Sequence, residues 1–396
     1  MLFFSLLCAT NRITQMSIQI EQYSSGTWLP ATGYKFFLPS KVNDQWLWND
    51  AQLNTLLEKA SIQLGELNSY ARLVPNIDLF IELHVTKEAV KSSRIEGTQT
   101  NINEAVLPEE EIKPERRNDW KEVKNYTNAL NAAINSLNDL PLSSRLLKQA
   151  HKILLSGVRG ENKLPGEYRS SQNWIGGSAP ADALFVPPSH IYVDELIGDL
   201  ENFLHNENIN VPALIRIGIA HYQFETIHPF LDGNGRIGRL LITLFLVDQK
   251  ILHKPLLYLS TYFEGNKSHY YDNLTRVREK GDLLHWLKYF LIGVEKTSKE
   301  AVITLSQVIK LKQELELSIH EKWGRRTQSA LKLLNALFLH PVITVKDAMS
   351  ICELTKKASG ELIESFEKAG ILSELTGQTR NRIFAFNRYL ELFQNE

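Results

Sequence analysis

The chain has 396 residues, of which 43% are hydrophobic and 22% charged, and its formal net charge is -1. This balance excludes a strongly basic nucleic-acid coat and a disordered chain, and the length allows two or three domains with a sizeable core. The two cysteines, Cys8 and Cys352, lie far apart, which argues against a disulfide framework and favours a reducing compartment. We therefore expect a cytoplasmic globular protein.

The first residues, MLFFSLLCAT, form a short apolar run like the core of a signal peptide. No Lys or Arg precedes the run, no small-x-small cleavage site follows it, and it is too short to span a bilayer. We interpret residues 1–15 as a doubtful leader from a start codon placed too far upstream, with an export signal as the alternative. No other segment is long and apolar enough to cross a membrane, so no membrane partner is expected.

Residues 19–40 are broken by glycine and proline, which predicts short strands or loops. Helical periodicity begins near Trp48 and continues in two segments, the second of which stops at Gly97. Two amphipathic helices separated by Pro141 follow. The chain therefore begins with a helical N-terminal region, residues 16–115, and passes into a core over residues 116–298.

Within this core, residues 157–190 are rich in Gly, Pro and Ser and end in a short apolar run, which predicts an extended flap or β-hairpin. Helices then resume, and the helix after Arg236 is so uniformly apolar that it should be central and buried. A polar helix at about residues 298–323 predicts a helical connector over residues 299–324.

From Thr327 onward, three helical segments precede an alternating stretch around Gly377, and this order is typical of a winged helix-turn-helix domain, residues 325–396. Basic residues in this unit could face nucleic-acid phosphates, but acidic residues are interspersed, so no basic stripe forms. We therefore favour protein docking or dimer support over DNA binding, with both alternatives open. The residues concerned are Lys356, Lys357, Arg380, Arg382 and Arg388, against Glu353, Glu361, Glu364, Glu367 and Glu374.

The stretch ETIHPFLDGNGRIGRLL, residues 225–241, gathers the groups that phosphoryl or nucleotidyl transfer requires. His228 can accept a proton near neutrality, and Asp232 is a hard oxygen ligand suited to Mg2+ that phosphates also bind. The glycines around Asn234 allow a sharp turn, and the helix that starts near Arg236 offers its N-terminus to an anion. Because seven suited positions fall within twelve residues, we favour a functional site over a solvated glycine turn.

Within this stretch, HPFLDGNGRIGR resembles the signature of the Fic family, HPFx(D/E)GNGRxxR, at every defining position. The resemblance implies an all-α core that binds ATP and Mg2+ and transfers AMP to a Ser, Thr or Tyr hydroxyl of a protein, with release of pyrophosphate. It implies that His228 is the base and Asp232 the magnesium ligand. The rest of the motif is expected to bind ATP: Gly233, Asn234 and Gly235 at the α-phosphate, Arg236 and Arg239 at the β- and γ-phosphates, with Ile237 and Gly238 between them.

The segment SSRIEG, residues 92–97, resembles the (S/T)xxxE(G/N) inhibitory helix of Fic proteins. The resemblance implies that Glu96, with Ser92 in the same motif, pairs with Arg239 and removes the cation that the γ-phosphate needs. The layout resembles that of bacterial Fic proteins with an added C-terminal winged helix, which often pair as dimers.

Two further regions resemble parts of the Fic nucleotide and target sites. The flap resembles the family's hairpin that aligns a target chain by strand addition, so a target protein is expected along residues 175–187, with Ile175, Gly176 and Gly177 near the nucleotide. A later helix resembles the one that shapes the nucleoside pocket, where Tyr270 would contact the sugar or phosphates and Arg278 the adenine. Aromatic residues at helical spacing are also typical of a core, and this alternative stays open for Tyr270.

Three other functions stay open from the residues alone. The chain could be a winged-helix DNA-binding regulator whose Fic core senses nucleotide, a Fic-fold transferase of another phosphate-containing group, or an enzyme that removes AMP. The two intact arginines favour ATP as the AMP donor. Six further histidines show no metal-ligand spacing and are expected to be structural or exposed: His151, His190, His221, His253, His269 and His285.

Overall fold

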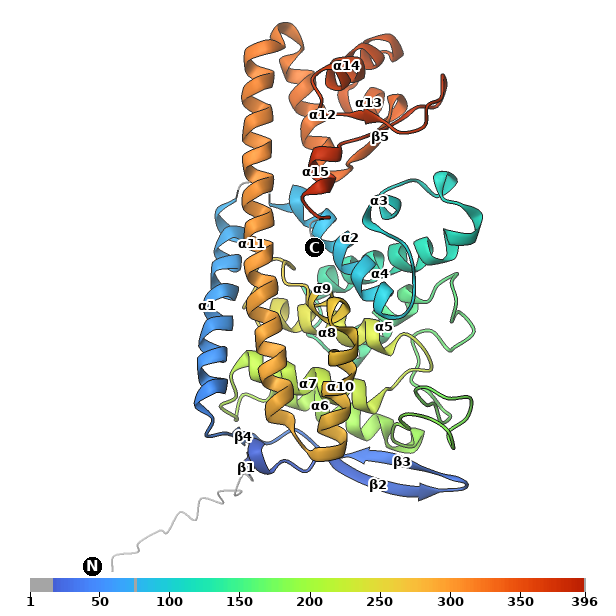
Figure 1. Ribbon diagram of the computed structural model, residues 1–396, viewed down its shortest axis with the longest axis vertical. Coiled ribbons are helices and arrows are strands. Elements are labelled where there is room, and N and C mark those ends of the chain that lie inside the picture. Colours follow the sequence, from blue (N-terminus) through green and yellow to red (C-terminus); the bar gives the residue numbers. More distant parts are fainter. Residues whose placement is uncertain (1–16, 75–76, 395–396) are drawn as a thin grey trace, which may run out of the picture.

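A computed structural model describes residues 17–74 and 77–394, and helices dominate it (Figure 1). The predicted leader, residues 1–15, lies outside these residues. Short strands open the described chain, as its glycines and prolines predict, and form one parallel and one antiparallel pair. The parallel pair is β1 (Ser17–Gln19) with β4 (Gln45–Leu47), and the antiparallel pair is β2 (Gly26–Ala31) with β3 (Tyr34–Pro39).

The helices of the main body follow the predicted order. The α-helices are α1 (Ala51–Leu73), α2 (Asp78–Ile95), α3 (Ile102–Ala105), α4 (Arg117–Ser136), α5 (Ser144–Leu154), α6 (Val193–His205), α7 (Ala213–Ile227), α8 (Asn234–Asp248), α9 (Ser260–Gly265), α10 (Lys267–Lys280) and α11 (Leu283–Lys322). Short 3-10 turns are η1 (Ile20–Gln22), η2 (Glu109–Glu111), η3 (Pro114–Arg116), η4 (His190–Tyr192) and η5 (Gly324–Arg326).

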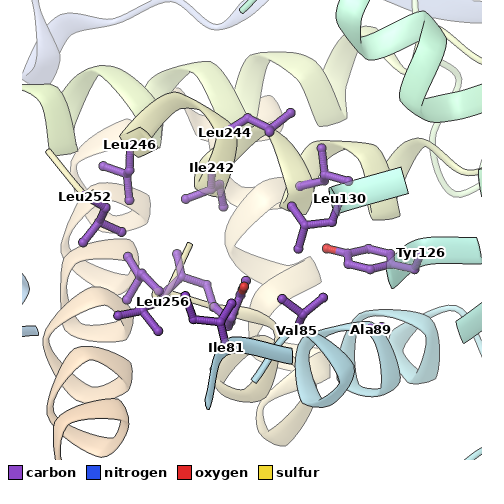
Figure 2. Packing of buried hydrophobic residues seen from close by; sticks show 14 of the residues in the cluster. Ile81, Val85, Ala89, Tyr126, Leu130, Ile242, Leu244, Leu246, Leu252 and Leu256 are labelled. Atoms are coloured by element: carbon purple, nitrogen blue, oxygen red, sulfur yellow. The ribbon is translucent and has the colours of Figure 1, made fainter. Parts of the chain in front are cut away.

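The centre of this body is α8, which is buried on nearly all sides, as its apolar sequence predicts. Apolar side chains of α2, α4 and α8 meet in one core, including Val85, Leu130 and Ile242 (Figure 2). This core therefore fixes the position of α8 relative to α2 and α4. In the part of the chain described here, no helix has both the length and the apolar character needed to cross a membrane.

The longest helix, α11, runs for 40 residues and packs along α1 (Figure 1). It crosses residue 298 without interruption, so the predicted connector over residues 299–324 is the second half of one helix and not a separate element. Its buried positions continue through Val302, Leu305 and Ile319, which explains why the polar surface residues did not end it.

The C-terminal unit contains the three expected helices, a short fourth helix at its end and a small antiparallel sheet with strand order β5-β7-β6, so the predicted hairpin around Gly377 is present. Its name as a winged helix stays a prediction. The unit packs on α2, where Phe338 meets Phe80 edge-on and Phe393 meets His84. Its elements are α12 (Thr327–Leu339), β5 (Val342–Thr344), α13 (Val345–Cys352), α14 (Lys356–Lys368), β6 (Ser373–Glu374), β7 (Ile383–Ala385) and α15 (Asn387–Glu391).

Candidate functional site

The turn between α7 and α8 carries the candidate site. His228 ends α7 in the left-handed region, with φ 51° and ψ 60°, and its N–H donates to the Phe224 carbonyl at 2.9 Å. Pro229 follows it and disfavours a further helical residue. Gly233, with φ 76°, caps the start of α8. A non-glycine residue held at positive φ costs free energy, so the surrounding contacts must fix His228 there.

Asn234 fixes the shape of this turn. Its side-chain oxygen accepts the Phe230 N–H at 2.7 Å, and its amide nitrogen donates to the Phe230 carbonyl at 2.8 Å. The side chain is buried, so these bonds hold the turn closed. The first turn of α8 leaves main-chain N–H groups without helical partners, which favours an anion there. Any phosphate contact of Asn234 stays a prediction.

His151, on α5, holds the turn from the other side. Its Nδ1 accepts the Gly166 N–H at 2.8 Å, and therefore its Nε2 donates to the Asp232 carbonyl at 2.9 Å. Burial lowers the pKa of His151 to about 4, so the ring stays neutral. Of the two predicted alternatives for His151, structural or exposed, the structure shows the first: the side chain is buried and supports the turn.

Arg169 and Asn173, at the start of the flap, hold the carbonyls that follow His228. Arg169 Nε donates to the His228 carbonyl at 3.0 Å, and its main-chain N–H donates to the Pro229 carbonyl at 2.9 Å. Asn173 donates to the Phe230 carbonyl at 2.8 Å. The flap and the turn are therefore one hydrogen-bonded structure.

The imidazole of His228 is held neutral. Burial, together with the nearby cations of Arg278 and Arg169, lowers the pKa of His228 to about 4. A hydrogen bond with the Glu225 main chain opposes this shift in the pKa of His228 without reversing it. A neutral imidazole can accept a proton at physiological pH.

Asp232 stands at the open side of the turn, with its side chain 34% exposed. Its Oδ1 accepts the Gly233 N–H at 2.6 Å and faces Arg236 Nη2 at 3.4 Å. Among the described residues no group of three His, Cys, Asp or Glu side chains could hold a metal ion. A single exposed carboxylate nevertheless fits Mg2+, which proteins often hold by one or two carboxylates together with substrate phosphates and water.

The two arginines of the motif each meet a carboxylate. Arg239 Nη2 lies 2.7 Å from Glu96 Oε1, and the same guanidinium donates to the side-chain and main-chain oxygens of Ser92, both at 2.9 Å. Burial opposes ionisation of Glu96, but the charge and hydrogen bond of Arg239 outweigh it and hold the pKa of Glu96 below its ordinary value. Arg236 Nη1 donates to Glu122 Oε2 at 2.9 Å.

Gly235 lies directly beneath the Glu96 carboxylate. A β-carbon at this position would lie 2.3 Å from Glu96 Oε1 and 2.9 Å from Arg239 Nη1. Only a glycine therefore lets Glu96 approach the first turn of α8 in this position.

The flap is a narrow hairpin. Ile175 pairs with Phe185, donating its N–H to the Phe185 carbonyl at 2.8 Å, and Gly176 and Gly177 have φ values of 70° and 69°. The Phe37 N–H of β3 donates to the Val186 carbonyl at 2.9 Å, so the N-terminal hairpin continues the flap. The predicted hairpin is therefore present, whereas its nearness to a nucleotide stays a prediction.

Several predicted ATP contacts have packing roles here. Tyr270 is 1% exposed, stacks on Phe263 and shares its hydroxyl with His221, which is typical of core packing, while its contact with the sugar or phosphates stays a prediction. Ile237 is fully buried, and Gly238 packs against the Glu225 carboxylate. The contacts of these three residues with ATP stay predictions.

Arg278 lies close to the turn rather than in an open pocket. Its Nη2 faces the Glu225 carbonyl at 3.4 Å, and its guanidinium lies over the Phe185 ring, 3.9 Å from the centroid. The contact with adenine stays a prediction, but Arg278 belongs to the surroundings of His228.

Sequence reasoning missed Glu122, Arg169 and Asn173. Glu122 is 114 positions from Arg236, and no local spacing links the two. Glu122 is one of several charged residues in α4, so no signal in the sequence indicated that its side chain would be buried, with 2% exposed.

Both motifs, residues 92–97 and residues 228–239, lie in segments that match known protein families. The model of the Fic/DOC family N-terminal region matches residues 54–135, and the model of the Fic/DOC family matches residues 141–246. A Caenorhabditis elegans protein named protein adenylyltransferase fic-1 is 29% identical over 164 residues, which are 39% of this chain and 30% of that protein. An Aquifex aeolicus protein named probable protein adenylyltransferase aq_aa38 is 28% identical over 177 residues, 45% of this chain and 52% of that protein. The chain thus spans about half or less of these relatives.

Two solved structures share the fold. A Fic family protein from Desulfovibrio desulfuricans G20 gives a TM-score of 0.53 at 21% identity and covers 85% of this chain and 96% of its own. A Fic domain containing signaling protein from Bacteroides thetaiotaomicron VPI-5482 gives 0.51 at 18% identity and covers 65% of this chain and 97% of its own. At these identities the likeness establishes the helical architecture.

Proposed function

Because the chain belongs to the Fic/DOC family, we propose that it is a protein adenylyltransferase, which moves AMP from ATP to a Ser, Thr or Tyr hydroxyl of a target protein and of itself. The observation that carries this proposal is that one turn, which leads into the N-terminus of α8, holds both the neutral imidazole of His228 and the partly exposed carboxylate of Asp232.

In the proposed reaction, the α-phosphate of ATP lies against the first turn of α8. The target hydroxyl oxygen attacks the α-phosphorus, and its proton passes to the neutral imidazole of His228. The bond from the α-phosphorus to the bridging oxygen of the β-phosphate breaks, and pyrophosphate leaves with that electron pair. Asp232 would hold Mg2+, which neutralises phosphate charge when bound. Arg236 and Arg239 would hold the distal phosphates.

We further propose that Glu96 inhibits this reaction. Its contact with Arg239 occupies the guanidinium edge that a γ-phosphate would need, and Ser92 holds the same group. Because Glu96 caps the end of α2 and its side chain is 29% exposed, it can swing away while the helix stays in place.

The target protein is proposed to dock along residues 175–187 by main-chain pairing with the flap. For the C-terminal unit, protein docking or dimer support remains favoured over DNA binding. Arg388 pairs with Glu314 at 2.9 Å and Arg382 faces Glu367 at 3.9 Å, so two of the candidate phosphate contacts already face carboxylates. A fluorescence assay of the full chain with duplex DNA at physiological salt tests the alternative. Tight, sequence-specific binding would favour DNA binding over protein docking or dimer support.

The central test compares the parent chain with Glu96→Gly, using ATP labelled at the α-phosphate together with Mg2+. Glu96→Gly should label itself and targets in a lysate, and mass spectrometry should find an AMP adduct on particular hydroxyls. His228→Ala in the Glu96→Gly background should abolish labelling but keep ATP binding. If the Glu96→Gly form neither binds ATP nor becomes labelled, the proposed function is wrong.

A further inference from the structure

The carboxylates that hold the two motif arginines both lie in the segment that matches the Fic/DOC N-terminal region, residues 54–135. Glu96 ends α2 and Glu122 lies in α4, and both fall within residues 54–135. Arg236 and Arg239 are one turn apart on α8, within residues 141–246. Each arginine therefore receives one carboxylate from the N-terminal region.

The two carboxylates differ in their freedom to move. The Glu96 side chain is 29% exposed and follows the last residue of its helix. The Glu122 side chain is 2% exposed, and it projects from within a 20-residue helix that packs on α8. Glu122 therefore cannot leave Arg236 without a shift of α4, whereas Glu96 can leave Arg239 by side-chain rotation.

The contacts of Arg236 show what Glu122 achieves. Nη1 is bound to Glu122 Oε2 at 2.9 Å while Nη2 points to Asp232 Oδ1 at 3.4 Å, so the guanidinium is oriented beside the expected metal ligand. A second cation, Arg159, lies with its Nε 3.6 Å from the other oxygen of Glu122. The charges of the Glu122 and Asp232 carboxylates are balanced by the two guanidinium groups. Glu122 therefore orients Arg236 without giving the site a net negative charge.

We propose that Glu122 is a positioning residue for the phosphate site, which acts by holding Arg236 and has the opposite effect on catalysis from Glu96. This inference rests on the proposed adenylyl transfer. Loss of Glu96 frees a cation for ATP and raises transfer, whereas loss of the Glu122 charge lets the buried Arg236 side chain reorient and lowers it. If Glu122 were a second inhibitor, its removal would raise transfer instead.

The experiment uses the full chain with Glu96→Gly as the reference enzyme. Adding Glu122→Gln, which keeps the shape and an acceptor oxygen, should lower kcat/KM for ATP about tenfold, mainly through a higher KM, because a misaligned clamp weakens ATP binding. Glu201→Gln is the matched control, since Glu201 accepts the Ser144 N–H at 2.8 Å on α6, away from the turn. Unchanged KM for ATP, or increased transfer, overturns the proposal.

A double-mutant cycle separates positioning from a general loss of structure. In the Glu96→Gly, Arg236→Ala form, ATP affinity measured by calorimetry should not change further when Glu122→Gln is added, because the group through which Glu122 acts is gone. A further loss of affinity contradicts the proposal. If Glu122→Gln does not fold, Glu122→Asp replaces it with the same expected direction. Failure of the reference enzyme itself to bind or transfer would instead refute the proposed function.

Discussion

The ring of His151 lies flat against the ring of Phe230, with centroids 3.8 Å apart and 10° between the planes. This stack joins α5 to the turn that carries His228, and the two ring nitrogens of His151 bind Gly166 and Asp232. The support of the candidate site is therefore partly an aromatic contact and partly a fixed tautomer.

His151→Phe should keep the stack but remove both hydrogen bonds. The Gly166 N–H and the Asp232 carbonyl would lose their partner, at a cost of about 1–3 kcal/mol in unfolding free energy, and transfer by the Glu96→Gly form should fall as Asp232 loosens. Thermal unfolding and transfer rates measure both effects. His253→Phe, at an exposed position, is the control, and equal behaviour of the two variants would contradict the supporting role.

The same substitution should also reduce acid sensitivity. In the unfolded chain His151 binds a proton at its ordinary pKa of 6.5, whereas in the fold it does so only at about 4. The parent therefore loses stability as pH falls from 6.5 toward 4, by roughly 1.4 kcal/mol per unit for this group. The difference in melting temperature between parent and variant should shrink over that range.

Ser92→Ala should release inhibition partly. It removes the acceptor for Arg239 Nε but leaves Glu96 in place, and a hydrogen bond to a charged group contributes about 1.5–3 kcal/mol. We expect self-labelling above the parent and below Glu96→Gly. Ser93→Ala is the matched control, because the Ser93 hydroxyl is buried without a hydrogen-bond partner. Equal rates for the two serine variants would refute a role for the Ser92 hydroxyl.

Gly235→Ala should disturb the parent more than the Glu96→Gly form. The new methyl would lie 2.3 Å from Glu96 Oε1 and push the carboxylate from Arg239, whereas without Glu96 this clash is absent. Melting temperatures of the four forms test this coupling. Gly198→Ala, within α6 and with no atom near the new methyl, should stabilise both backgrounds by up to about 1 kcal/mol. Additive effects of Gly235→Ala and Glu96→Gly would contradict the contact.

Arg278→Ala should move the acid limb of the pH–rate profile. The Arg278 cation helps to lower the pKa of His228 to about 4, so its loss should raise that pKa and make the rate fall at a higher pH. The profile of kcat/KM in the Glu96→Gly background measures the midpoint, whatever the absolute rate. Arg276→Ala, which removes an exposed partner of Asp282, should leave the midpoint in place. Superimposable profiles for both variants would refute the electrostatic coupling.

The turn from His228 to Arg239 was predictable because its chemistry is local: the end of α7, the glycines and the start of α8 follow one another in the sequence. Glu122 was not predictable, because its partner is set by the packing of α4 on α8. Tyr270 shows the limit of periodicity, since helical spacing alone does not distinguish a tyrosine that only packs in the core from one that also contacts a ligand. For α11, a change in surface polarity was mistaken for a boundary although no proline interrupts residues 283–322.

The origin of the two acidic partners has a consequence for dissection of this protein. An excised fragment that began at residue 141 would retain the histidine turn but strip the counter-ions from two deeply enclosed guanidinium groups. Because α2 and α4 also cover the apolar face of α8, the isolated piece would expose core surface beside its unpaired arginines and should be prone to misfolding instead of behaving as an unregulated enzyme. Recombination that separated residues 54–135 from residues 141–246 would cause the same loss of stability. The two segments are therefore expected to be inherited together.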